Sequence, residues 1–539
     1  MAFKHIMKTL GLQSMAAVLL FTAGSYACAE NNMQQVYIGP LPQPAASPQT
    51  QEKIASPGDE TASPKHAAPG PLEISVRSAI LLSLENNRAL KVEKFNPAIR
   101  RTAEEETRAA FDPVLAAGYS RSRERREIES RPSSTGVNSE IALDLELSEY
   151  LPTGTDIDLE ISTQKTWASL YSDDLHESRL GLSITQALLQ GAGLEYNLAS
   201  LRQARLDTVV SLYELRGFAE SLVAQVEETY WDYALTQQQI KIFEESLNLA
   251  QQQKDETEEM IKIGYLAESE LAAAQAEIAL RREGLINARS NLEKIRLQLL
   301  RLLNPPDSNQ WQREINLLHQ PAMPEVTLDD IESHVEVALR MRPDLNQARL
   351  KVRQGDLEIV KTRNGLLPRL DFFISLGKSG YADSFARSVR DIDEDSYDAG
   401  AGLSLEFPLV NRKAQARYQA SLFSRSQADE AVKNFVQLVQ VDVRSAYIEV
   451  NRTGEQITAT AATRALQEEK ARIEAEKFRV GKSTTLLVAQ AQRDLLSSRI
   501  SEIQAITNYL KALIELYRLE GSLLERRGIL APGSETVEN

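Results

Sequence analysis

The sequence predicts a mixed fold, in which β-strands of the membrane type alternate with long coiled-coil helices in two tandem structural repeats. Leu90 and Pro113 recur 255 residues later as Leu345 and Pro368, so the chain contains a duplication. Each copy has the same order of a short helix, alternating strands and two very long helices. Neither copy buries its own hydrophobic seams, so each must pack against the other copy or against other chains. The helical positions that recur 217 residues later are Tyr230 and Tyr447, Gly264 and Gly481, and the pairs Ala274-Gln275 and Ala491-Gln492.

The composition of the 539 residues fits extended helices better than several thick globular cores, because 42% are hydrophobic but only 6% are aromatic. The net charge is −15, and loss of a leader that carries Lys4 and Lys8 changes it by two, to −17. Such an acidic chain argues against nucleic acid as a partner. After the leader, no run approaches the ~20 apolar residues of a membrane-spanning helix. If the protein crosses a bilayer, it does so with strands.

Residues 1–29 have the features of a secretory signal peptide. A basic start is followed by an apolar stretch over 15–23, and Ala27 and Ala29 are the small residues of a cleavage site before Glu30. The sequence therefore predicts export.

Cys28 is the only cysteine, and its fate depends on where the leader is cut. Cleavage after Ala29 removes it, whereas a lipoprotein would be acylated on it. Ser25 occupies the place where a lipoprotein signal needs Leu or a similar residue, which favours simple cleavage. Residues 30–71 follow as a disordered spacer rich in Pro and Ala, in which the prolines prevent regular structure.

The first repeat is expected over 72–303 and the second over 327–520, with an inter-repeat linker at 304–326 and a C-terminal tail at 521–539. Each repeat opens with a short helix. In the second repeat, Thr327 and Asp330 are expected to form its N-cap and capping-box acid. In the first repeat the helix is indicated by the spacing of Leu72, Val76, Ile80 and Leu84.

Strands are expected over about 114–187 in the first repeat and about 368–408 in the second, because hydrophobic residues alternate there with polar ones. A hairpin around Pro152-Thr153-Gly154 has one apolar and one acidic face. A soluble sheet that packs its apolar face on a helix would show the same alternation, which is a weak membrane signal. The acids of this hairpin, candidates for lining a lumen or a solvated loop, are Asp144, Glu146, Asp156, Asp158 and Glu160.

Two long helical hairpins are expected over 194–303 and 411–520. Their apolar residues step 3-4-3-4, which is the seam of a coiled coil. The outbound helix from Leu194 to about Gln252 would measure roughly 90 Å. Because these seams are committed to helix packing, the helices leave no apolar partner to cover the sheet, which favours membrane strands.

The turns of the two hairpins resemble those of the TolC-type outer-membrane efflux protein family, and the resemblance extends over most of 72–521. The strand-to-helix junctions Gln186-Ala187-Leu188 and Phe407-Pro408-Leu409 are also similar to that family's pattern. The residues that carry the resemblance at the turns are Ile263, Gly264, Tyr265 and Leu266 in the first hairpin and Val480, Gly481 and Lys482 in the second.

The resemblance implies a homotrimer in the outer membrane of a Gram-negative bacterium, with one shared β-barrel and a long periplasmic α-helical barrel. It implies the exit duct of a tripartite efflux pump or type I secretion system, with outer-membrane lipid, a periplasmic membrane-fusion adaptor and an inner-membrane pump of the RND, ABC or MFS type as partners. The helical turns would dock on the adaptor. No cofactor is implied, and the exported substrate is left open.

The sequence departs from the family pattern in three places, one of which is Ala187, where the second copy has Pro408 and the first bend is expected to be softer. The first strand region spans 74 residues from Pro113 to Ala187, against 40 from Pro368 to Pro408, so the usual four strands per chain are in doubt. Either two strands are added to the barrel or a hairpin extends from it.

The third departure concerns the periplasmic gate. Relatives have acids six and nine residues beyond the second turn glycine, where this chain has Leu487 and Gln490; Glu270, six beyond Gly264, is the alternative source of charge. A ring of leucines closes by apolar contact, whereas a ring of carboxylates binds cations.

An enzyme is not expected. Gly481-Lys482-Ser483-Thr484 resembles the end of a phosphate-binding loop, but Glu476 replaces the required glycine. The histidines have no metal-ligand spacing. The alternative from another class is a periplasmic coiled-coil adaptor or structural protein without its own channel, although an adaptor has one helical hairpin and this chain predicts two.

Overall fold

The computed structural model describes residues 71–127, 135–168, 175–306, 310–322, 328–393 and 395–531. The expected signal peptide with Ala27 and Ala29, the spacer up to residue 70, and Thr327 lie outside the described residues. The described part belongs to one compact unit, Ala68–Asn539.

The first described elements are β1 (Leu72–Ile74) and α3 (Val76–Asn86). The expectation that Leu72 opens a helix is wrong, because Leu72 pairs with Ile315 in a parallel two-stranded sheet formed with β6 (Ile315–Leu317). The helix begins only after Ser75, whose side chain and that of Ser78 form a reciprocal capping box. α4 (Arg88–Glu93), α5 (Asn96–Arg108) and a 3₁₀ turn at Ala109–Phe111 then lead to Pro113.

The corresponding helices of the second half are α9 (Ile331–Met341) and α10 (Pro343–Asn364). Asp330, expected as the acid of a capping box, is itself the N-cap of α9, and its carboxylate accepts the Glu332 N–H at 3.3 Å.

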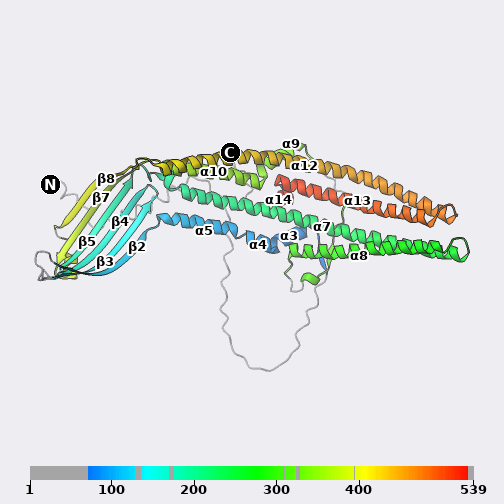
Figure 1. Ribbon diagram of the computed structural model, residues 1–539, viewed down its shortest axis with the longest axis horizontal. Coiled ribbons are helices and arrows are strands. Elements are labelled where there is room, and N and C mark those ends of the chain that lie inside the picture. The colour runs from blue at the N-terminus through cyan, green and yellow to red at the C-terminus, as the bar shows by residue number, and fades with distance from the viewer. Residues whose placement is uncertain are drawn as a thin grey trace, which may run out of the picture. The chain divides into compact units, whose positions relative to one another are not determined.

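Six strands form one antiparallel sheet within the described residues, in the order β2-β3-β4-β5-β7-β8 (Figure 1). A short helix, α11 (Phe385–Asp391), lies between the last two strands along the chain. The strand bounds are β2 Val114–Glu127, β3 Thr135–Leu151, β4 Thr155–Ala168, β5 Leu175–Ala187, β7 Arg369–Ala382 and β8 Tyr397–Glu406.

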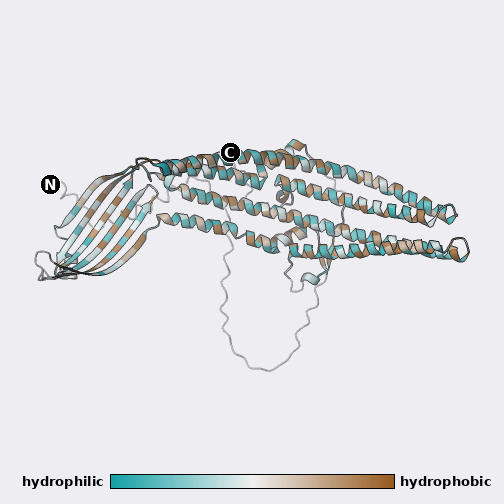
Figure 2. Ribbon diagram, in the orientation of Figure 1, coloured by the Kyte–Doolittle hydropathy of each residue, from teal (hydrophilic) through white to brown (hydrophobic). Residues whose placement is uncertain are grey.

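The register gives the sheet one apolar and one polar face. Leu145 lies opposite Ile161, and the neighbouring pair is Glu146 and Glu160, whose side chains lie on the other face because strands have a period of two. Figure 2 shows the resulting alternation of hydrophilic and hydrophobic bands along the strands. The hairpin at Pro152-Thr153-Gly154 joins β3 to β4, so the additional residues of the first strand region are part of the sheet.

The long helices form two hairpins that lie side by side (Figure 1), with α13 in contact with both α7 and α8. α7 has 64 residues and continues to Lys262, beyond the expected end near Gln252, which corresponds to roughly 96 Å. A four-residue helix, α14 (Leu523–Arg526), follows the second hairpin. The helices of the hairpins are α6 (Leu194–Asn197), α7 (Ala199–Lys262) and α8 (Ser269–Leu303), and α12 (Arg412–Arg479) and α13 (Thr485–Glu520).

The main hydrophobic core surrounds the middle of α7, where α3, α8, α13 and α14 meet it. Val223, Val226 and Tyr230 are fully buried there. The Tyr230 hydroxyl donates to the Ile74 carbonyl at 3.3 Å, which ties the small β1–β6 sheet to the helix. Among the described residues, no helix is both long and apolar enough to cross a bilayer.

Candidate functional site

The turns of the two long hairpins have the same backbone geometry. Gly264 has φ 76° and Gly481 has φ 71°, both in the left-handed region that favours glycine. In each turn the next residue closes a bond back to the helix: Tyr265 N–H donates to the Met260 carbonyl, and Lys482 N–H donates to the Lys477 carbonyl, both at 2.8 Å.

The other predicted turn residues are presented to solvent. Ile263 is 78% exposed and Val480 is 63% exposed. Leu266 is half-buried.

The two turns touch one another through Tyr265. A Cβ placed on Gly481 would overlap the Tyr265 hydroxyl, whereas a Cβ on Gly264 would meet nothing within 4 Å. The first turn therefore covers the second. No local sequence pattern signals this contact, because residues 216 positions apart come together only when the hairpins pack.

The three expected gate residues lie in the first two turns of the return helices, next to the hairpin turns. Glu270 is in the first turn of α8. α13 begins after Thr484, whose side chain accepts the Leu487 N–H, and Leu487 is 47% exposed. Gln490 is exposed one turn later. Glu270 itself is half-buried.

A series of ion pairs joins the two hairpins along their length. Lys511 on α13 contacts Asp232 on α7 at 2.9 Å, and Arg499 contacts Glu245 at 3.3 Å. Closer to the turns, Arg479 lies 3.7 Å from Glu256. Sequence reasoning missed these pairs because the partners are more than 200 residues apart.

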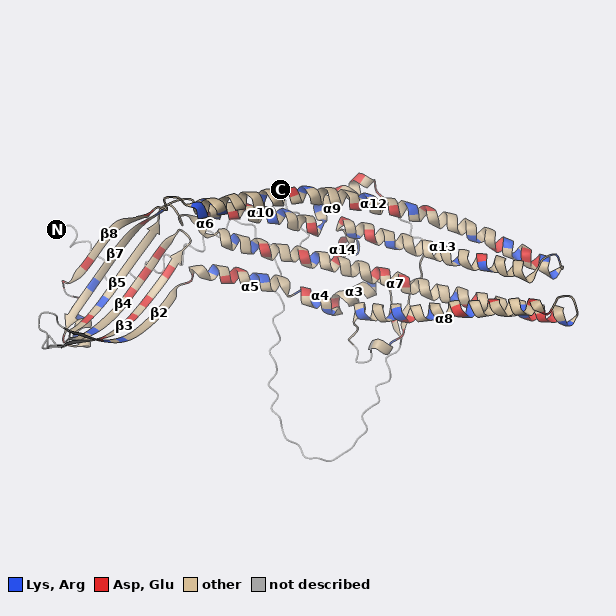
Figure 3. Ribbon diagram, viewed as in Figure 1, with Lys and Arg blue, Asp and Glu red and all other residues tan. Residues whose placement is uncertain are grey.

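The five predicted acids of the β3–β4 hairpin lie on the same face of the sheet. Glu146 is opposite Glu160, Asp144 is opposite Ser162, and the partners of Asp156 and Asp158 have the same parity. Figure 3 shows acidic residues as red bands on neighbouring strands of the sheet. On the same face, Arg179 of β5 reaches across β7 to Asp398 of β8 at 2.8 Å. Gly377 permits this ion pair, since a Cβ there would overlap both side chains.

A buried charge network holds the C-terminal end of α13 against α7. Arg216 is fully buried and donates to the Gly521 carbonyl at 2.8 Å and to Glu525 at 2.7 Å. Glu220 is paired with Arg216 at 3.2 Å. Burial raises the pKa of Glu220 to about 8, although the Arg216 charge opposes the shift.

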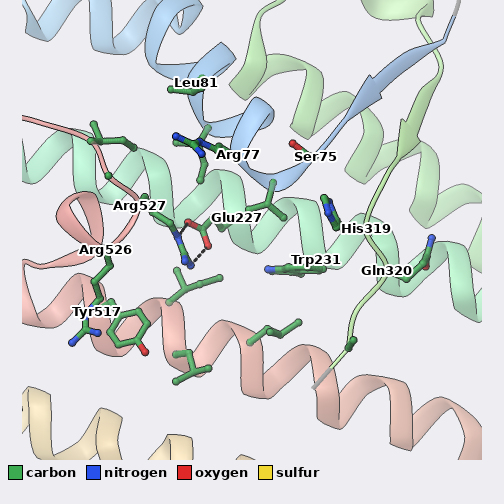
Figure 4. Close-up of a pocket in the computed structure, with 18 residues that line it drawn as sticks. Ser75, Arg77, Leu81, Glu227, Trp231, His319, Gln320, Tyr517, Arg526 and Arg527 are labelled. Atoms are coloured by element: carbon green, nitrogen blue, oxygen red, sulfur yellow. Dashed lines mark hydrogen bonds and ion pairs between the residues drawn. The ribbon is translucent and has the colours of Figure 1, made fainter. Parts of the chain in front are cut away.

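An open cleft of about 830 Å³ lies beside this network, between α3, α7, α13 and the C-terminal segment. Figure 4 shows Arg527 pointing to Glu227 across one wall, with Trp231 and Tyr517 on the helices that line the cleft. The Arg527–Glu227 pair has two contacts of 2.6 Å, and Glu227 is 1% exposed. Within the described ranges, no three His, Cys, Asp or Glu side chains are grouped as metal ligands.

Comparison with known proteins gives a family match in the second half of the chain. Residues 335–522, from α9 to the end of α13, match the outer membrane efflux protein family. The match covers about a third of the chain.

Individual proteins are also similar to this chain. The alkaline protease secretion protein AprF of Pseudomonas aeruginosa is 30% identical over 168 residues, which are 30% of this chain and 34% of AprF. The match thus spans about a third of that relative's length. The outer-membrane channel OprN has a TM-score of 0.63 at 17% identity, over 83% of this chain and 90% of OprN. The MtrE outer membrane channel of Neisseria gonorrhoeae has a TM-score of 0.60 at 17% identity, over 83% of this chain and 89% of MtrE. The structural likenesses show that the fold of these channels covers both halves of the chain.

Proposed function

We propose that three copies of this chain form an outer-membrane channel of a Gram-negative bacterium, the exit duct of an efflux pump or type I secretion system. Substrates would pass from an inner-membrane transporter and a periplasmic adaptor to the exterior. One observation carries the proposal: a sheet with an exposed apolar face continues into two paired helical hairpins, in a chain whose residues 335–522 match the efflux-protein family.

The apolar face of the sheet is the surface proposed to contact lipid. Leu115, Leu403 and Leu405 are 71%, 65% and 67% exposed. Large apolar side chains at such exposure on one face mark a surface that is covered in the functional state. In lipid every strand must also have its backbone groups paired, which a closed barrel provides.

The outer side of α12 is the surface proposed to contact other copies in a helical barrel. Val441, Ile448 and Leu466 are 61%, 64% and 73% exposed, although they lie on a long helix whose other side is packed. The coiled-coil seam is therefore only partly used within one chain.

The hairpin turns are proposed to dock on the adaptor, because Ile263 and Val480 expose apolar side chains at the very ends of the hairpins. Gly481→Asp should abolish export while trimers persist. The control is Gly528→Asp, at a glycine outside the turns whose φ of 69° is close to the 71° of Gly481 and which has open space around it. Normal export by Gly481→Asp would contradict docking at this turn.

The gate is proposed to depend on Glu270 rather than on the residues of α13, where Leu487 and Gln490 replace acids. Divalent-cation block of single-channel current should be lost in Glu270→Ala and retained in Gln490→Ala. Strong block that survives Glu270→Ala would remove Glu270 from the gate.

The decisive test of the channel is residence and conductance. The mature protein should fractionate with the outer membrane, run as a heat-sensitive trimer after gentle detergent extraction, and conduct ions in planar lipid films. A soluble periplasmic monomer would contradict the channel and favour a coiled-coil adaptor. Since AprF is named as a protease secretion protein, export assays should include a secreted polypeptide as well as small toxic compounds.

A further inference from the structure

We propose, resting on the trimeric channel above, that the β2 edge of one copy pairs with the β8 edge of the next and closes a barrel of 18 strands. Each copy supplies six strands to it, and three times six is 18. Four strands per chain would give 12. The barrel diameter grows about linearly with strand number, so this barrel is about one and a half times as wide.

The two additional strands are fully integrated into the sheet. β3 pairs with β2 over its length, for example Ala117 with Leu145, and β4 pairs with β5, for example Leu159 with Leu182. Both long edges of the β3–β4 hairpin are thus occupied, so the hairpin does not extend away from the sheet.

The turn of this hairpin is also fixed to the start of the helices. The Asn197 side-chain amide donates to the Pro152 carbonyl at 3.0 Å and accepts from the Tyr150 hydroxyl at 2.9 Å. A Cβ on Gly154 would overlap the Gly191 carbonyl, so the turn packs directly on the strand-to-helix junction. The hairpin is anchored at the same level as the other strands.

The strands β2 and β8 are the two edges of the sheet in the described part of the chain. Every neighbouring pair is antiparallel, so the first and last of six strands run in opposite directions. An edge of β8 therefore meets an edge of β2 from another copy in the antiparallel sense that the rest of the sheet uses. Exposed unpaired edges of this length are otherwise sites of aggregation.

The side chains of both edges match as well. On the apolar face, β2 presents Leu115 and Tyr119, and β8 presents Leu403 and Leu405, all at least 65% exposed. On the polar face, both edges carry small residues, namely Gly118 and Ser120 on β2 and Gly400 and Gly402 on β8. Joining the edges continues one apolar and one polar surface around the barrel, so the partner is a second copy of this chain.

Thiol cross-linking tests the strand count, because the mature protein lacks cysteine once the leader with Cys28 is removed. Within one chain, Ala117→Cys with Leu145→Cys should be joined by a short bifunctional thiol reagent in the outer membrane, and Ala117→Cys with Leu182→Cys should not. Cross-strand neighbours have Cβ atoms only about 5 Å apart. The reverse result would mean that β2 adjoins β5, and it would overturn the 18-stranded barrel while leaving a trimeric channel.

The junction between copies is tested in three double variants. Each combines Ala117→Cys with one cysteine on β8, which is Ala399→Cys, Ala401→Cys or Leu403→Cys. One of these should give covalent trimers on denaturing gels. The matched controls combine Ala117→Cys with Gly400→Cys or Gly402→Cys, whose side chains lie on the other face. They should give at least tenfold less covalent trimer. Equal yields of covalent trimer from both faces of β8 would overturn the edge pairing. An absence of outer-membrane trimers before cross-linking would instead overturn the channel itself.

Discussion

The two long hairpins have similar helices and turns but occupy different surroundings. α7 is contacted by α3, α5, α8, α10 and α13, whereas α12 packs mainly on α10 and α13. Residues 217 positions apart show the contrast. Arg216 and Glu220 are buried on α7, while Lys433 and Gln437 at the matching places on α12 are exposed.

The two hairpins therefore have similar backbones but different surroundings. The first hairpin supplies the core of its own chain, including buried charges that need partners. The second hairpin keeps a surface with exposed apolar side chains, which is where the proposed contacts with other copies lie. Substitutions at matched positions should therefore have unequal effects, and the predictions below start with the most unequal pair.

The largest difference is expected between Arg216→Ala and Lys433→Ala. Loss of Arg216 breaks its buried contacts with Glu220 and Glu525 and leaves the Gly521 carbonyl without a donor, which should lower the free energy of unfolding by about 3–5 kcal/mol. Lys433 forms exposed pairs with Asp429 and Glu430, so its removal should leave denaturant unfolding of the purified protein unchanged.

The double variant Arg216→Met with Glu220→Gln controls for the origin of this effect. It replaces the buried guanidinium with an apolar side chain and Glu220 with an amide that cannot ionise, and it should recover a large part of the loss. Equal destabilisation by Arg216→Ala and Lys433→Ala would show that the two hairpins are not divided as proposed.

The second contrast is in pH dependence. Because burial raises the folded-state pKa of Glu220 to about 8 from the ordinary 4.5, the folded protein binds this proton more tightly than the unfolded chain. The stability from this group is complete below pH about 4.5 and is lost as the pH rises to about 8, with a slope of at most about 1.4 kcal/mol per pH unit. Glu220→Gln should flatten thermal stability across this window.

The matched control is Glu430→Gln on α12, a carboxyl that is 74% exposed. The pH dependence of its thermal stability should follow that of the unsubstituted protein. A Glu220→Gln profile that keeps the full slope would assign the pH dependence to other groups, such as Glu228, whose pKa burial also raises.

The sequence predicted the elements better than their contacts. Period-two alternation and heptad spacing are local signals. The strands and long helices lie where these signals indicated. Leu72 was misassigned because Leu72, Val76 and Ile80 fit a helix, although Ser75 interrupts the spacing with a cap. The β1–β6 pairing has partners 243 residues apart, and no local pattern marks a strand of three residues.

For the candidate site too, local features could be predicted from the sequence, but contacts between distant residues could not. The turn glycines could be named, since positive φ is a backbone requirement that glycine meets. The burial of Arg216 could not, because its partners Gly521 and Glu525 lie some 300 residues further along the chain. A charged residue on an amphipathic helix is by default solvated, and only tertiary packing reverses that.

The third contrast separates the two turns. Gly264→Ala and Gly481→Ala each force alanine into a positive φ, which costs roughly 1–2 kcal/mol locally. Only Gly481→Ala also displaces the Tyr265 hydroxyl. Amide hydrogen exchange should therefore rise around residues 262–268 of the first turn in Gly481→Ala, whereas Gly264→Ala should not raise exchange around the second turn.

A double-mutant cycle with Tyr265→Ala separates strain from contact. Once the ring is removed, Gly481→Ala should no longer affect the first turn, and the two substitutions should be non-additive. Additive effects would show that the turns move independently in solution.

The smallest effect is expected from the ion pairs that join the hairpins. Arg499 is one-third exposed and contacts Glu245 of α7 and Glu468 of α12, so Arg499→Gln should lower stability by about 0.2–1 kcal/mol. At 1 M salt the screening length falls to about 3 Å, and the difference in stability should disappear.

Arg452→Gln is the control, since Arg452 pairs with Glu449 of its own helix and does not join the hairpins. If Arg499→Gln raises hydrogen exchange along α7 at low salt and Arg452→Gln does not, the ion pairs hold the two hairpins together. If the loss persists at 1 M salt, packing of the Arg499 side chain rather than its charge is responsible.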